Sequence, residues 1–134
     1  AELADIYENI FLACSNNLKT DGIVLSGSAV AGDKISVTEG VRATLLLTLS
    51  DPNNVAPIAG TSVTIEVKNN EGHTIDVTPT TFEVGNREVF PPSHPVFITL
   101  TGDGDAGQAG TITITGTNTD GTLTSPVIYD IIKQ

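Results

Sequence analysis

The chain has 134 residues, 39% of them hydrophobic, which indicates one folded domain that can bury a core without metal or disulfide. Aromatic residues make up only 4%, and Met and Trp are absent, so Val, Ile and Leu must supply that core. Sixteen acidic and six basic residues give a net charge of -10, which repels nucleic acid and anionic lipid. The charge argues against both as partners, and no apolar run is long enough to insert into a membrane.

Residues 1–20 have the hydrophobic period of a helix. Apolar side chains recur every three or four positions, and Ser15-Asn16-Asn17 supplies a stop, because Asn tolerates the left-handed conformation that ends helices. The pattern predicts a short N-terminal amphipathic helix whose apolar stripe needs a cover, either a partner or its own domain. We therefore assign residues 1–20 as a helical or attachment segment. Its predicted partner-binding residues are Leu3, Ile6, Tyr7, Ile10 and Phe11.

Cys14, the only cysteine, continues this stripe and is expected to be a small apolar residue of the helix. A single cysteine rules out an internal disulfide. Lipid attachment is not expected, because no basic segment precedes Cys14 and acidic residues interrupt the apolar run. A start at Ala1 fits a cytoplasmic protein without its initiator Met as well as an exported protein without its signal peptide, so the sequence leaves both routes open.

From Asp21 onward the hydrophobic period is two. The clearest case is residues 41–50, where Leu46 is the one apolar residue on the polar side. The apolar side comprises Val41, Ala43, Leu45, Leu47 and Leu49. Turn residues separate such segments at roughly ten-residue spacing, which predicts one antiparallel β-sandwich over residues 21–134. The predicted strands are residues 23–30, 34–38, 41–50, 61–68, 73–78, 81–84, 95–101, 110–117 and 122–132.

The last predicted strand is apolar on nearly both faces. This pattern indicates a central strand or a contact surface, because a strand with one solvated face alternates more strictly. The preceding strands each carry one apolar face. The core predicted from those faces includes Val63, Ile65, Val67, Ile75, Val77, Phe82, Val96, Ile98, Leu100, Ile112 and Ile114.

Four motifs in order give residues 22–117 a family resemblance. Val37-Thr38-Glu39-Gly40 leads into a long alternating strand, and Val63-Thr64-Ile65 follows a Gly-Thr turn. Val77-Thr78-Pro79-Thr80-Thr81-Phe82 comes next, and an acidic Gly-Asp turn follows residues 96–100. Together they resemble bacterial immunoglobulin-like repeats of surface proteins, of the invasin and Calx-beta types. The resemblance implies an immunoglobulin-like sandwich that acts as a stalk or adhesive unit, sometimes with calcium at acidic loops; similar sandwiches decorate phage capsids and tails. The helix and the long last segment depart from that pattern.

The acidic loop is the candidate metal site. Asp103 and Asp105 flank Gly104, and Gln108 is nearby; a glycine lets a tight loop converge hard oxygen ligands on calcium. The spacing lacks the third acid and the closing bidentate Glu of an EF-hand. A solvated turn is therefore expected, with calcium as the alternative, and no other cofactor is predicted.

No catalytic residue is predicted. His73 and His94 have no Cys, His or acidic neighbour at zinc-ligand spacing, and nothing suggests a base positioned on a nucleophile. The glycine-rich residues 102–110 lack the Lys and the following helix of phosphate-binding loops. The chain is not expected to be an enzyme.

Two non-enzymatic functions are left open. In the first, the chain is a structural subunit of a larger assembly, such as a virion capsid decoration, tail or fibre component. Its N-terminal segment then contacts neighbouring protein subunits, its own copies included. In the second, it is an adhesion or ligand-binding module of a bacterial surface protein, with loops making the contacts. The N-terminal helix and the absence of an Asn-X-Ser/Thr sequon favour the first, on a virion or a cell surface.

Overall fold

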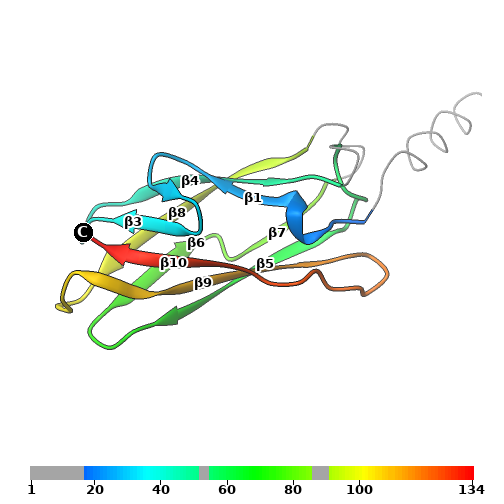
Figure 1. Ribbon diagram of the computed structural model, residues 1–134. Helices are drawn as coiled ribbons and strands as arrows, with labels where there is room; N and C mark the ends of the chain where they lie inside the picture. The colour runs from blue at the N-terminus through cyan, green and yellow to red at the C-terminus, as the bar shows by residue number, and fades with distance from the viewer. Residues whose placement is uncertain (1–16, 52–54, 86–90) are drawn as a thin grey trace, which may run out of the picture.

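The computed structural model describes residues 17–51, 55–85 and 91–134, and these fold as a sandwich of two β-sheets (Figure 1). Alternating apolar and polar residues form these strands because successive side chains point to opposite faces. A 3-10 turn, η1 (Thr20–Gly22), precedes the first strand. Among the described residues, no helix has the length and apolar character needed to cross a membrane. The predicted N-terminal helix, with Leu3, Ile6, Tyr7, Ile10 and Phe11, lies outside the described residues.

Ten strands make up the described sandwich. They are β1 (Ile23–Ser26), β2 (Val30–Ala31), β3 (Lys34–Val37), β4 (Ala43–Leu49), β5 (Ser62–Asn69), β6 (Thr74–Thr78), β7 (Thr81–Glu83), β8 (Ser93–Thr101), β9 (Gly107–Thr117) and β10 (Val127–Lys133). One sheet has the order β1-β4-β8-β6, and the other has the order β2-β3-β10-β9-β5-β7. The predicted all-β sandwich is confirmed.

The two sheets are antiparallel except at one pair. β3 and β10 run parallel, with Lys34 opposite Asp130 and Val37 opposite Lys133. The prediction of a wholly antiparallel sandwich is therefore wrong at this pair, because the chain crosses between the sheets before β3. β10 lies between β3 and β9. The segment that is apolar on nearly both faces is thus a central strand.

The core fills the space between the two sheets. Nine of the eleven predicted core residues are buried, whereas Val67 and Val77 are partly buried against the core. Leu18, Tyr129 and Ile131 also belong to it. The buried apolar cluster therefore extends from the first described residues to the last strand.

Two predicted strands end or begin at turns that the alternation does not reveal. Residues 23–30 break at Gly27, whose φ is 150° and whose carbonyl accepts a 3.1 Å hydrogen bond from Val30 N–H. That turn carries the chain from one sheet to the other. β4 starts at Ala43, because Val41 N–H donates to Thr38 O at 3.0 Å and closes a turn. Val41 is 57% exposed, so its predicted place on the apolar face is wrong.

The described chain enters and leaves the sandwich at opposite ends (Figure 1). We call the end with residues 17–22 and the β9–β10 loop the N-terminal pole. The other end carries the β5–β6 and β8–β9 loops and the last residue, Gln134, whose N–H donates to Val37 O at 3.0 Å. We call it the C-terminal pole. The poles and the two outer sheet faces are the surfaces open to partners.

Candidate functional site

Leu18, assigned from the sequence to the attachment segment, lies inside the sandwich at the N-terminal pole. Its side chain is 1% exposed. Its N–H donates to Asn118 Oδ1 at 2.8 Å, and its carbonyl accepts from Asn118 Nδ2 at 3.3 Å. One buried amide thus satisfies both backbone groups of Leu18, which would otherwise be costly to bury. The described chain therefore begins at a fixed point of the domain.

Two glycines make room for this clamp. A Cβ at Gly116 would lie 2.7 Å from Leu18 Cδ2, and one at Gly22 would lie 1.9 Å from the Ser50 carbonyl oxygen. Gly116 N–H also donates to Thr124 Oγ1 at 2.9 Å. The sequence analysis did not predict this clamp. Its one signal is an isolated apolar Leu18 between two polar residues, too weak to separate from the helix stripe.

Exposed hydrogen bonds extend the clamp along the β9–β10 loop. Thr20 Oγ1 donates to Ser125 O at 3.2 Å and accepts from Ser125 N–H at 2.9 Å. Asp120 accepts from Thr122 N–H at 2.9 Å and from Asn17 Nδ2 at 3.3 Å. The hydrogen bonds from Thr122, followed by the one from Asn17, hold the pKa of Asp120 below its ordinary value. Residues 17–20 are therefore hydrogen-bonded to the β9–β10 loop at the surface of the N-terminal pole as well as in its interior.

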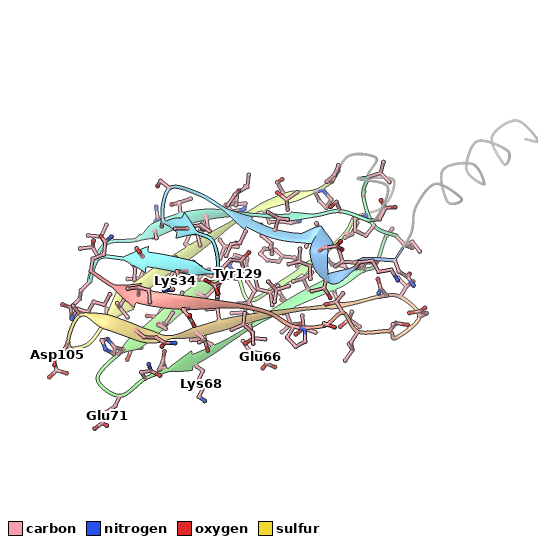
Figure 2. All side chains as sticks on the ribbon, viewed as in Figure 1. Lys34, Glu66, Lys68, Glu71, Asp105 and Tyr129 are labelled. Atoms are coloured by element: carbon pink, nitrogen blue, oxygen red, sulfur yellow. The ribbon has the colours of Figure 1, made fainter. Side chains whose placement is uncertain are left out.

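The predicted calcium residues lie at the C-terminal pole. Asp103 and Asp105 are exposed in the β8–β9 loop, and Figure 2 shows Asp105 pointing away from the sandwich. Gly104 between them donates its N–H to Gly72 O at 2.8 Å. The Gly104 carbonyl accepts a hydrogen bond from Lys133 Nζ at 2.5 Å. The loop is thus held by its neighbours on both sides.

The charges around this loop include a cation from the protein itself. Lys133 Nζ lies 3.6 Å from Glu39 Oε2, in addition to its contact with the loop carbonyl. In residues 17–51, 55–85 and 91–134, no three His, Cys, Asp or Glu side chains gather as a metal site would require. A third carboxylate, Asp51, is 4% exposed and lies at the N-terminal pole, where it accepts from Val55 N–H at 3.1 Å. At Asp103 and Asp105 a solvated turn stays the prediction, and calcium binding stays its alternative.

The two histidines pack against other elements. The His94 ring on β8 stacks on Phe82 of β7, with centroids 4.8 Å apart and planes at 23°. His73 lies against the acidic loop, where a Cβ at Gly104 would be 2.5 Å from His73 Nε2. His94 thus fills space between the sheets, and His73 fills space between two loops.

An apolar patch crosses three strands of the four-stranded sheet on its outer side. Leu46 of β4 lies opposite Pro95 of β8, with Val24 of β1 and Phe97 of β8 one diagonal away. Val24 is 47% exposed and Leu46 is 43% exposed. The Arg42 guanidinium lies 4.6 Å from the centroid of the Phe97 ring. We call these five residues the β1–β4–β8 face.

The fold has relatives among solved structures. No protein-family model matches the chain, and no curated protein matches it. WR4, an MSP family member of C. elegans, has a TM-score of 0.56 and 13% identity, over 84% of this chain and 98% of WR4. The S-layer protein SbsC domains 4 and 5 have a TM-score of 0.48 and 21% identity over 83% of this chain, which spans 53% of that structure. The likeness to WR4 shows a shared β-sandwich fold.

Proposed function

We propose that this chain is a non-enzymatic structural subunit of a larger protein assembly, attached through residues 1–16. The clamp between Leu18 and Asn118 carries the proposal. It fixes the point at which a segment with the sequence pattern of an amphipathic helix joins a domain whose buried cluster already extends from Leu18 to Ile131. An apolar stripe that its own core does not require is suited to cover a neighbouring subunit.

The surrounding chemistry supports a protein partner in a virion or cell-surface assembly. A net charge of -10 opposes binding to nucleic acid and to anionic lipid. The apolar stripe of Leu3, Ile6, Tyr7, Ile10 and Phe11 calls for an apolar protein surface instead. A capsid decoration, tail or fibre component offers such a setting, because each subunit there meets neighbours at fixed positions.

A second candidate, a module of a longer bacterial surface protein, is favoured by the positions of the two poles. The described chain enters beside Asn118 and leaves beside Val37, at opposite ends of the sandwich (Figure 1). Modules joined in series need this arrangement, because each must pass the chain to the next without folding back. In that candidate the exposed loops would make the adhesive contacts.

The deciding experiment compares the full chain with a chain that starts at Asn17. Thermal unfolding measures the fold, and co-sedimentation with the native particle, fibre or cell surface measures attachment. We expect the shorter chain to melt cooperatively near the full-length temperature and to lose attachment. Retained attachment would contradict the proposal and favour recognition by loops in a surface module. Aggregation of the shorter chain would show that residues 1–16 cover their own sandwich.

A further inference from the structure

The β1–β4–β8 face is apolar, whereas most outward positions of its three strands are polar. Residues that alternate with the core positions Ile23, Leu45 and Val96 point outward, and most of them are Ser or Thr. At Val24, Leu46, Pro95 and Phe97 the outward residue is apolar instead. Single exposed apolar residues are common, but apolar residues adjacent across three strands form a contact surface.

This face also lacks the negative charge of the chain as a whole. The outward positions of β1, β4 and β8 carry no acidic residue, although the chain has a net charge of -10. The charged side chain of the face is Arg42, stacked on Phe97. By contrast, Glu66 and Lys68 project from β5 on the outside of the other sheet (Figure 2). The β1–β4–β8 face is thus an apolar surface with Arg42 at one border and Asp76 of β6, opposite Thr99, at another.

Residues 1–16 match the apolar centre of this surface and the positive charge of Arg42 at its border. Their apolar stripe is flanked by Glu2, Asp5 and Glu8, so the segment offers apolar side chains together with negative charge. We propose that residues 1–16 of one copy dock on the β1–β4–β8 face of a second copy. This inference rests on the proposed function and names the partner of the attachment segment as another copy of the same chain.

The N-terminal pole favours a second copy over the same chain. Asn17 and Leu18 are bound to Asp120 and Asn118, in the loop between two strands of the six-stranded sheet. Asn17, where the described chain begins, therefore lies beside that sheet, whereas the docking face covers the outside of the four-stranded sheet. A segment and a face at different places on one molecule form a heterologous contact, which joins copies into a ring or an open fibre.

The test uses the full chain in sedimentation velocity over a range of concentrations. One variant, Leu46→Glu, alters the face, and a second, Ile6→Glu with Ile10→Glu, alters the stripe. Ile128→Glu is the matched control, because Ile128 is 55% exposed on the outside of the six-stranded sheet. We expect the face and stripe variants to weaken self-association by about tenfold or more, since each removes buried apolar area, and the control to leave it unchanged. Unchanged thermal unfolding separates lost association from lost fold.

A mixture of the face variant with the stripe variant identifies the occupant. The stripe variant keeps an intact face and the face variant keeps an intact segment, so together they form a one-to-one complex that neither forms alone. A mixture that stays monomeric overturns the inference, and so does a full chain that is monomeric at every concentration. Association lost in the stripe variant and kept in the face variant also overturns this docking face, but it leaves the proposed attachment through residues 1–16 standing.

Discussion

The hydroxyl of Tyr129 on β10 (labelled in Figure 2) accepts a 3.4 Å hydrogen bond from the N–H of Leu25 on β1, a strand of the opposite sheet. A similar contact closes the other edge of the four-stranded sheet, where Ile75 N–H of β6 donates to Asn69 Oδ1 at 2.9 Å. Unpaired N–H groups on edge strands are templates for pairing with another chain. Each edge strand of this sheet therefore has one N–H occupied by a side chain from β10 or β5, which makes that N–H unavailable for pairing with another strand.

Replacing Tyr129 with Phe should remove the hydrogen bond from Leu25 N–H to the Tyr129 hydroxyl and keep most of the ring packing. We expect the free energy of unfolding to fall by about 1 kcal/mol, the usual net contribution of one hydrogen bond. Amide hydrogen exchange should become faster at Leu25 and stay unchanged at Ile75, because the Ile75 N–H is bound by Asn69 and not by Tyr129. Equal exchange at Leu25 in both proteins would show that the long hydrogen bond contributes nothing.

Leu47→Asp tests the assignment of the two sides of β4. Leu47 is 0% exposed, and an unpaired buried carboxylate costs several kcal/mol against a total stability of about 5 to 15 kcal/mol, so the domain should unfold. Thr48→Asp should have little effect, because Thr48 is only half-buried and its hydroxyl bonds to Ser93 at 3.0 Å on the outer side. Circular dichroism during heating checks both variants, and similar losses would contradict the assignment.

Asn118→Ala should open the clamp on Leu18. The buried N–H and carbonyl of Leu18 would both lose their partner, at a cost of about 1 to 3 kcal/mol for each group left unsatisfied. Urea denaturation measures the loss. Thr119→Ala, at the exposed neighbouring position, is the control and should change stability very little. A control as unstable as Asn118→Ala would locate the effect in the loop backbone instead.

Asp120 should give the N-terminal pole a dependence on acid. Its pKa is lowered in the folded state, first by the Thr122 hydrogen bonds, so its stabilising effect is present above its unfolded pKa and is lost as the pH falls through the folded pKa. The melting temperatures of the wild type and Asp120→Asn should therefore differ at neutral pH and converge in acid. A difference that does not change with pH would contradict a role for the ionised carboxylate.

Calcium should leave the melting temperature unchanged. Lys133 Nζ already binds the carbonyl of Gly104, and binding to the folded state alone would otherwise raise stability by mass action. Differential scanning fluorimetry with and without millimolar calcium is the measurement. A rise that disappears when Asp103 and Asp105 are both changed to Asn would show that the acidic loop binds the ion.

Alternation in the sequence predicts the strands well because burial of one face fixes every second residue. It places Leu45 and Leu47 in the core, and it marks Leu46 as the one apolar residue on the polar side of its strand. That exception is now part of the β1–β4–β8 face. The sequence therefore contained a sign of this surface, but a lone exposed Leu is ordinary until Val24 and Pro95 are found beside it.

Other features depend on contacts between distant residues, which periodicity does not encode. Leu18 and Asn118 are 100 positions apart, and nothing local to either residue indicates the clamp. The parallel pairing of β3 with β10 likewise depends on the change of sheet after Gly27. Val41 is exposed although it is apolar, because its N–H donates to the Thr38 carbonyl in a turn that precedes β4.

The parallel alignment of β3 with β10 determines how the domain would respond to tension between its poles. A pull on the N-terminal side loads the pairing of β1 with β4 first and then, through β2, draws β3 toward the N-terminal pole, while a pull on Gln134 draws β10 the other way. The two strands are then sheared along their length, so their hydrogen bonds, from Lys34 with Asp130 to Val37 with Lys133, bear the load together instead of opening one after another. Such a domain would resist stretching most strongly along the axis on which its two ends lie.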